Sequence, residues 1–271
     1  MKKLVFTLAT CCIMCACEQK TETNPFFTEF RTEYGAPDFD KIKIEHYEPA
    51  FLKGIEEQNA EIKAIVESRE TPGFENTIVA LDNSGRTLAR VKGVFYALTE
   101  ADTNDEMSAL SEKIAPVLSE HNDNIYLNQD LYKRVAAVWQ QEQEGKITLT
   151  TEQHRLLDRY YKAFIRSGAG LDAGKQNRLR EINKELSTLA ITFSNHVLNE
   201  NNAYRLVIDN EAELAGLPEW VKTGAAEEAK AVGKEGKWLF TLQNSSRLPL
   251  LQYADNRELR KDIYEAYINR G

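Results

Sequence analysis

The sequence has 271 residues, of which 42% are hydrophobic and 28% are charged, and its formal net charge is −8 at pH 7. This composition is ordinary for a folded globular chain, so it excludes a disordered segment and a bundle of membrane-spanning helices. The negative charge also argues against a nucleic-acid partner, because phosphate binding requires clustered lysine and arginine.

The amino terminus has the layout of a bacterial secretion signal. A pair of lysines follows the first methionine, and the apolar run after them is too short to span a bilayer. All four cysteines lie in the segment "CCIMCAC" at residues 11–17. Its last part, "MCAC", resembles the lipobox of bacterial lipoproteins, with the small residue Ala16 directly before the acceptor Cys17.

These features predict a signal peptide at residues 1–16 and lipid attachment at Cys17. Residues 17–23 would then form a polar tether that holds the protein at a membrane of the bacterial cell envelope, on its periplasmic or its outer face. A signal that is cleaved without lipidation and an uncleaved cytosolic chain are the alternatives. Disulfides and a metal cluster are not expected here, because the rest of the chain offers no partner thiol.

Residues 24–271 are predicted to form one mostly α-helical body without an internal linker. Apolar residues recur with helical spacing, and Thr103 and Thr150 each stand three residues before a Glu or Gln, as in capping boxes. Two short runs, 204–209 and 237–243, are rich in β-branched or aromatic residues and are predicted to pair as a small antiparallel β-ribbon. The expected helices span residues 46–68, 74–101, 104–125, 129–143, 151–168, 173–201, 218–233 and 256–271.

Two of these helices carry a clear apolar face. In the helix at 173–201 the apolar residues are separated by three or four positions, so we expect that face to be buried. In the helix at 256–271 we expect the apolar face to be partly exposed and to dock a further part of a larger protein. The first face consists of Ile182, Leu186, Leu189, Phe193 and Val197, and the second of Leu259, Ile263, Tyr264 and Tyr267.

The segment "IEHYEPAF" at residues 44–51 contains two residue types that bind zinc, His46 and Glu48. On a helix, residues two apart point about 200° apart, whereas ligands that share an ion stand three or four apart. Pro49 fits the first turn of a helix, where its missing N–H is not needed. The segment is therefore interpreted as the start of a helix and not as half of a metal site.

The histidines of the chain do not form a zinc motif. The motif His-Glu-x-x-His presents two imidazoles one helical turn apart, with a glutamate that activates the metal-bound water. Here each histidine is at least 33 residues from the next, so roles on helix surfaces or caps are expected. They are His46, His121, His154 and His196.

Other catalytic motifs are also missing from the sequence. "GAGLDAGK" at residues 168–175 matches a loose dinucleotide pattern, but it follows a helix, and Gln176 stands where a phosphate-binding loop needs Ser or Thr. It is interpreted as a helix end and a turn. There is no G-x-S-x-G, and no thiol outside the signal segment. Motifs alone therefore assign no catalytic residue and no metal ligand to this chain.

Several longer words of the sequence nevertheless resemble one family. In order along the chain, they resemble the amino-terminal half of the thimet-oligopeptidase-like family of zinc metallopeptidases, and its peptidyl-dipeptidase branch more than its oligopeptidase A branch. The words include "FDKIKIEHYEPAF" at 39–51, "FENTIVALDNSG" at 74–85, "RYYKAFIRSGAGL" at 159–171, "ELSTLAITFSNHVLNE" at 185–200 and "GKWLFTLQNSSRLPLLQYADNR" at 236–257.

The resemblance implies a mostly helical, two-lobed shell around a deep channel that admits short peptides, with residues 24–271 as much of one wall. In such an enzyme, which releases dipeptides from the carboxyl end of oligopeptides, zinc is held by the His-Glu-x-x-His histidines and a downstream glutamate. Those ligands, and a tyrosine that stabilises the oxyanion, lie in the carboxy-terminal half of the family. None of them can be placed on a position of this sequence, and the resemblance gives His46 and Glu48 no metal role.

Two functional expectations follow. In the first, the chain is the incomplete amino-terminal part of such a peptidase, inactive without the catalytic half, through a frameshift, a split gene or an incomplete sequence. In the second, it is a non-enzymatic helical lipoprotein that binds peptides or a protein partner. The sequence stops on the helix that begins near 256 without a closing element, which favours the first expectation.

Replacement of the lipid acceptor tests the predicted anchor. We expect the Cys17→Ser variant, expressed in a bacterial host, to leave the membrane fraction or to keep its signal peptide, because the multiple acyl chains of a lipoprotein supply the membrane affinity. Fractionation and intact-mass measurement check this. A variant that stays in the membrane with the same processing and mass as the wild type would contradict lipidation at Cys17.

Overall fold

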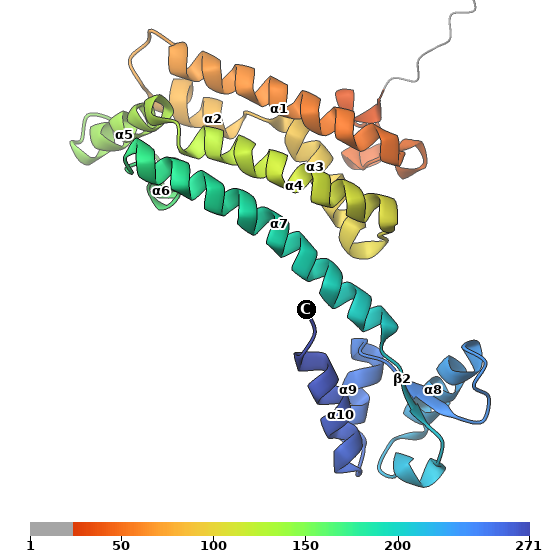
Figure 1. Ribbon diagram of the computed structural model, residues 1–271. Coiled ribbons are helices and arrows are strands. Elements are labelled where there is room, and N and C mark those ends of the chain that lie inside the picture. Colours follow the sequence, from red (N-terminus) through yellow and green to blue (C-terminus); the bar gives the residue numbers. More distant parts are fainter. Residues whose placement is uncertain (1–23) are drawn as a thin grey trace, which may run out of the picture.

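The computed structural model describes residues 24–271, which are arranged as a layer of long helices and a smaller lobe (Figure 1). Helix α7 (Ala173–Ala203) runs from the layer to the lobe and connects the two. The predicted signal peptide, the tether and Cys17 lie outside the described residues. The predicted fold class, a mostly α body with a small β-ribbon, is confirmed.

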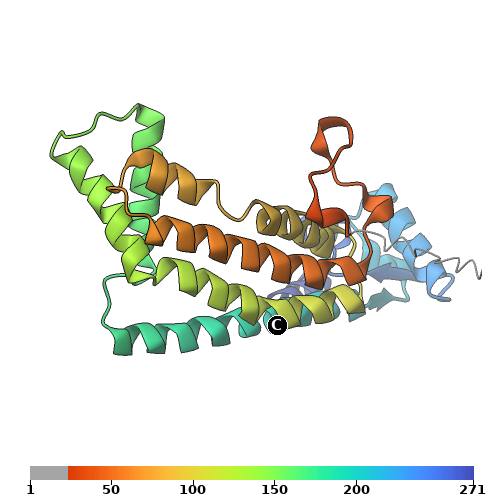
Figure 2. The same cartoon turned by 90° about the horizontal axis from the view of Figure 1, so that it is seen from above.

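The helical layer is built from α7 and the helices that precede it. These are α1 (Ile44–Glu67), α2 (Ala80–Asp82), α3 (Arg86–Ala101), α4 (Asp105–Tyr126), α5 (Gln129–Gln143) and α6 (Thr151–Arg166). The view from above shows α1, α4 and α7 side by side, while α3 packs on α1 and α5 pairs with α6 (Figure 2). Short 3-10 helices at Pro25–Phe27, Glu33–Gly35 and Phe39–Lys41 precede α1. Within residues 24–271, no helix combines the length and the apolar character needed to cross a membrane.

Two apolar clusters stabilise the layer. One lies where α1 packs on α3 and α4, and Phe51 and Phe95 at its centre are completely buried. The other lies toward the opposite end of α1, where Leu131 of α5 and Phe164 of α6 are completely buried. Each such side chain contributes roughly 1.5–3 kcal/mol by leaving water. Burial at both ends of α1 makes this helix the support on which the layer is assembled.

The predicted helix at 74–101 is interrupted. A π-helical turn at Phe74–Val79 leads into α2, and the chain turns again before α3 begins. Gly85 at this second turn has φ 72°, a left-handed conformation that glycine adopts without a steric penalty. Its N–H donates to Glu61 Oε2 of α1 at 2.7 Å. The apolar periodicity continues across the turn, which is why the sequence predicted one helix.

The two predicted capping boxes have different outcomes. At the start of α6 the box is confirmed, because Thr150 Oγ1 accepts the Gln153 N–H at 3.3 Å and Gln153 Oε1 accepts the Thr150 N–H at 3.0 Å. At the start of α4 the box predicted at Thr103 is wrong. Asn104 is the N-cap there, and its Oδ1 accepts the Met107 N–H at 2.9 Å.

The smaller lobe follows α7 and contains the predicted ribbon. Strand β1 (Leu206–Ile208) pairs antiparallel with β2 (Trp238–Phe240), with Val207 opposite Leu239. The other elements of the lobe are a 3-10 helix at Glu211–Leu214, α8 (Glu219–Ala231), α9 (Asn244–Tyr253) and α10 (Arg257–Ile268). Helix α9 was not predicted, because its Asn-Ser-Ser start and Pro249 disfavour a helix. It forms because Leu250 is completely buried in the lobe's own apolar cluster.

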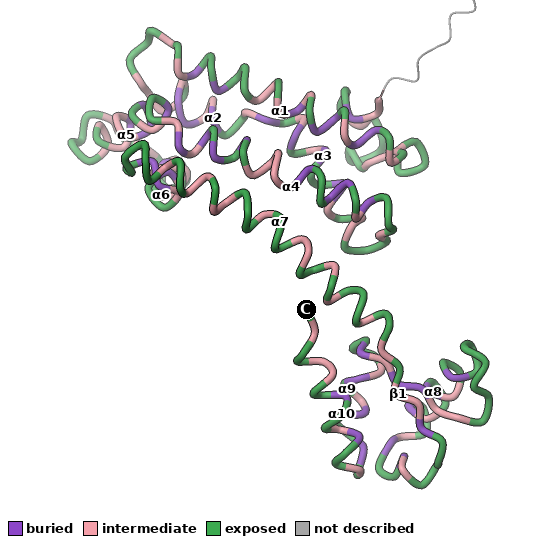
Figure 3. Tube along the Cα trace, viewed as in Figure 1, coloured by how far each residue is buried: buried purple, intermediate pink, exposed green. Residues whose placement is uncertain are grey.

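The apolar face of α7 is exposed, which corrects the prediction that it is buried. None of the residues of α7 is buried, and the tube coloured by burial shows this along the whole helix (Figure 3). Leu186, Leu189 and Phe193 are 56%, 54% and 57% exposed. Ile182 and Val197 are half-buried. We call Leu186, Leu189 and Phe193 the α7 stripe.

The predicted apolar face of α10 is divided. Leu259 and Ile263 are buried in the cluster of the lobe, whereas Tyr264 is 52% exposed. Tyr267 is half-buried between two guanidinium groups, with Arg247 and Arg270 at 3.5 and 3.7 Å from the centre of its ring. Half of this face therefore stabilises the lobe itself, and Tyr264 is the part of it that is exposed, in agreement with the prediction of a partly exposed face.

The close approach of α1 and α3 can be tested at two glycines. A Cβ at Gly54 would lie 2.8 Å from the backbone of Leu88, whereas one at Gly93 of α3 would meet nothing within 4 Å. We expect Gly54→Ala to destabilise the protein by about 1–3 kcal/mol, because it pushes the helices apart. The matched control Gly93→Ala should stabilise it by up to about 1 kcal/mol through helix propensity. Equal unfolding free energies of the two variants in urea would contradict this packing.

Candidate functional site

His46 and Glu48 belong to the start of α1, as the spacing predicted. His46 Nδ1 accepts the N–H of Lys43 at 3.0 Å and closes the first turn of the helix. Glu48 Oε1 pairs with Lys113 Nζ of α4 at 2.6 Å. The two side chains therefore have separate structural partners, and the interpretation of this segment as a helix start is confirmed.

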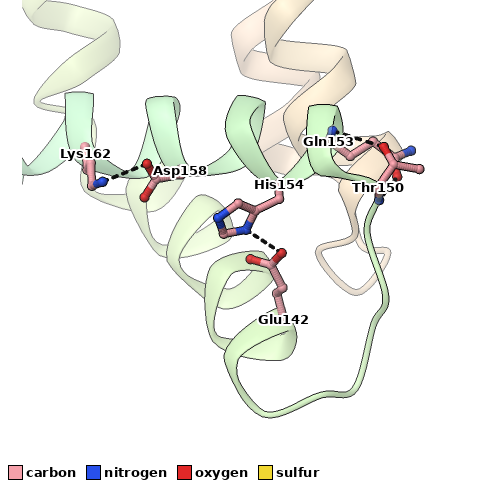
Figure 4. Close-up of polar contacts among 6 residues, drawn as sticks. All are labelled: Glu142, Thr150, Gln153, His154, Asp158 and Lys162. Atoms are coloured by element: carbon pink, nitrogen blue, oxygen red, sulfur yellow. Dashed lines mark hydrogen bonds and ion pairs between the residues drawn. The ribbon is translucent and has the colours of Figure 1, made fainter.

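His154 joins α5 to α6 at the surface (Figure 4). Its Nδ1 lies 2.7 Å from Oε1 of Glu142, across the loop that connects the two helices. On the same helix, Asp158 Oδ2 accepts from Lys162 Nζ at 2.7 Å. An ion pair at such an exposed position contributes roughly 0–1 kcal/mol. The contact between His154 and Glu142 closes the α5–α6 hairpin.

The described residues do not fit the zinc that the sequence resemblance implies. Within residues 24–271, no three His, Cys, Asp or Glu side chains lie together in a way that could hold a metal ion. His46, His121 and His154 have separate partners, and His196 lies exposed on α7. A catalytic zinc needs three protein ligands and an open position. The side chains of residues 24–271 therefore offer no such ligand set.

A small polar cavity lies inside the helical layer. It measures about 190 Å³ and is lined from α1, α2, α3, α4 and α6, with His121 as its most buried titratable residue. His121 Nε2 lies 2.7 Å from Gln58 Oε1, and Gln58 Nε2 donates to Ser84 Oγ at 3.2 Å. Because an amide oxygen only accepts, Nε2 carries the proton. Burial, and then the positive charge of Lys92, lower the pKa of His121, so its neutral form is favoured.

Tyr160 of α6 also lines this cavity. The hydroxyl of Tyr160 donates to Asp82 Oδ1 at 2.8 Å. Burial, together with this contact to a carboxylate, raises the pKa of Tyr160 above its ordinary value. The cavity therefore contains a neutral imidazole and a neutral phenol, and its lining comes from α1, α2, α3, α4 and α6.

The contact between α4 and α7 is polar. We call Arg180, Asn183 and Asn195 of α7 the polar seam. They donate to Asn124 Oδ1 at 2.9 Å, to Asp123 Oδ1 at 2.8 Å and to Glu112 Oε1 at 2.8 Å, all on α4. The polar seam was not predicted from the sequence, because only apolar periodicity was used to identify packed helix faces. The three residues of the seam nevertheless recur on one side of α7.

Comparison with known proteins identifies relatives of this chain. No family model matches it. It is 39% identical to dipeptidyl carboxypeptidase of Escherichia coli over 91% of this chain. It is 33% identical to oligopeptidase A of Salmonella typhimurium over 92%, and 25% identical to saccharolysin of Saccharomyces cerevisiae over 74%. This chain is a homologue of the dipeptidyl carboxypeptidases and oligopeptidases A.

The matched region covers most of this chain but only a minor part of each relative. The chain spans about a third of the length of the curated relatives it matches, 36% in both bacterial proteins and 28% in saccharolysin. The family resemblance stated from the sequence words, limited to the amino-terminal part of these peptidases, is thereby confirmed. The helical layer and the lobe are the structure of that shared region.

The buried imidazole predicts a pH dependence of stability. The pKa of His121 is lower in the folded protein than its ordinary value of 6.5, so the unfolded chain binds more protons between these two values. The contribution is fully present above pH 6.5 and is lost as the pH falls toward the folded pKa. We expect His121→Gln to reduce the fall in Tm between about pH 7.5 and about pH 5, because glutamine does not titrate in this range. The glutamine side chain can still donate to Gln58.

The matched control for this experiment is His196→Gln, which removes an exposed imidazole from α7 and leaves the cavity unchanged. It should show the full fall in Tm of the wild type. If both variants lose as much Tm on acidification as the wild type, the buried His121 does not limit stability at low pH.

Proposed function

We propose that this chain is the amino-terminal part of a zinc metallopeptidase that releases dipeptides from the carboxyl end of oligopeptides, and that it is inactive alone. The supporting observation is the extent of the match: 39% identity to dipeptidyl carboxypeptidase over 91% of this chain, but over only 36% of that protein. The lower identity to oligopeptidase A, 33%, favours the dipeptide-releasing branch.

The distribution of chemistry within the described residues agrees with this proposal. They contain no group of side chains able to hold zinc. In a complete enzyme the metal would polarise the peptide carbonyl and activate water, and its ligands would come from the remaining part of the protein. The residues of this chain would provide shape, as a wall that limits access to short peptides. The two apolar clusters along α1 suit that structural role.

The location of this peptidase is also a proposal. The lipobox-like segment before Cys17 supports a lipid-anchored protein of the bacterial cell envelope, where its substrates would be oligopeptides outside the cytoplasm. The second functional candidate is a non-enzymatic lipoprotein that binds peptides or a protein partner. The exposed α7 stripe is the observation in its favour, because exposed apolar surface marks interaction sites.

A chimaera tests the proposed function. Residues 24–271 would replace the matched region of Escherichia coli dipeptidyl carboxypeptidase. We expect the chimaera to retain zinc and to release dipeptides from an oligopeptide with a blocked amino terminus, and a chelator to abolish this activity. The chain alone should neither retain stoichiometric zinc nor cleave the peptide.

Two results would contradict the proposal. Zinc-dependent dipeptide release by the purified chain alone would show that it holds its own metal site. A folded chimaera that retains zinc but does not cleave would show that residues 24–271 do not replace the corresponding region of the relative, which would favour the binding lipoprotein.

A further inference from the structure

The α7 stripe does not lie on the side of α7 that contacts α4, so it does not stabilise the layer. At about 100° per residue, Leu186, Leu189 and Phe193 are centred roughly 150° around α7 from the polar seam. An amphipathic helix normally turns its apolar side toward its own core. Helix α7 instead turns polar residues toward α4 and three large apolar residues toward solvent.

The end of the described chain lies at this stripe. A Cβ on Gly271 would lie 2.1 Å from the ring of Phe193, so the backbone of Gly271 runs against that ring. Two contacts fix this position: the Gly271 N–H donates to Glu200 Oε2 at 3.0 Å, and Arg270 Nη1 donates to Asn201 Oδ1 at 2.7 Å. In a longer relative, the residues that follow this position would therefore start directly beside the stripe.

The surroundings of the stripe are open and carry charged residues. Leu186 also lines an open groove of about 530 Å³ between α4, the end of α6 and α7, together with Asp123 and Arg166. An apolar centre with charged residues at its edge is typical of a protein interface.

We propose that the α7 stripe docks the polypeptide that follows the matched region in the full-length relatives. This inference rests on the proposed function. The relatives are long enough to supply such a partner, because this chain spans only 36% of dipeptidyl carboxypeptidase. Helix α7 then has two interfaces: its polar seam belongs to the layer, and its stripe belongs to the interface with the remaining part of the enzyme.

Paired substitutions test the proposal in the chain and in the chimaera. Leu189→Gln with Phe193→Gln removes the centre of the stripe. The matched control, Leu52→Gln with Trp220→Gln, also changes one leucine and one aromatic residue, at 49% and 62% exposure. We expect neither pair to lower the Tm of the isolated chain. In the chimaera, the stripe pair should lower the Tm and the control pair should not.

Hydrogen exchange gives an independent reading of the same surface. Peptides that cover residues 182–198 should exchange more slowly in the chimaera than in the isolated chain, because docking protects α7. An unchanged exchange rate, or equal Tm losses for the two pairs in the chimaera, would overturn the proposal. So would an isolated chain that sediments as a dimer and becomes monomeric with the stripe pair, because the occupant would then be a second copy.

These measurements separate the docking inference from the proposed function. An inactive chimaera that protects residues 182–198 would reject the function and support the docking surface. An active chimaera with unprotected residues 182–198 would support the function and reject the docking surface.

Discussion

The arrangement of this protein depends on the polar contact between α7 and α4. Three hydrogen bonds to α4, from Arg180, Asn183 and Asn195, hold a helix that has no buried residue of its own. Because α7 joins the helical layer to the lobe, the relative position of these two parts rests on that contact (Figure 1). Net hydrogen-bond contributions are about 1 kcal/mol each, whereas each completely buried side chain in the two clusters of the layer contributes roughly 1.5–3 kcal/mol.

The polar seam and the exposed stripe have a common explanation. A helix fixed by apolar packing on α4 would have to turn its leucines inward, and none would remain for a second partner. Polar contacts on one side leave the other side free to be apolar. The homology points in the same direction, because the relatives extend far beyond the region that this chain matches. The apolar residues of α7 are thus assigned to an interface that residues 24–271 do not complete.

Much of the fold could be predicted from the sequence because local rules decided it. The Thr150 capping box, the start of α1 at His46 and the two-stranded ribbon follow from short-range chemistry. The break at Gly85 could not be predicted, because it depends on Glu61 of a neighbouring helix. The burial of the α7 face was predicted wrongly for the same kind of reason. Spacing identifies an apolar face but does not identify what covers it.

The candidate site shows the same limit. The sequence indicated correctly that His46 and Glu48 belong to the start of a helix. It gave no sign that His121 is buried beside Gln58, or that Tyr160 contacts Asp82, since both contacts join residues far apart in the chain. The family relationship came from long sequence words, and these describe the shared scaffold.

We infer that the outer side of α7 faces the remaining part of a larger peptidase. A photo-reactive phenylalanine analogue at Phe193, incorporated into the chimaera with Escherichia coli dipeptidyl carboxypeptidase, tests this most directly. Mass spectrometry of the cross-linked protein should identify residues from the relative's own sequence, outside the replaced region. Cross-links confined to residues 24–271, or formed between two copies of the chimaera, would contradict the account.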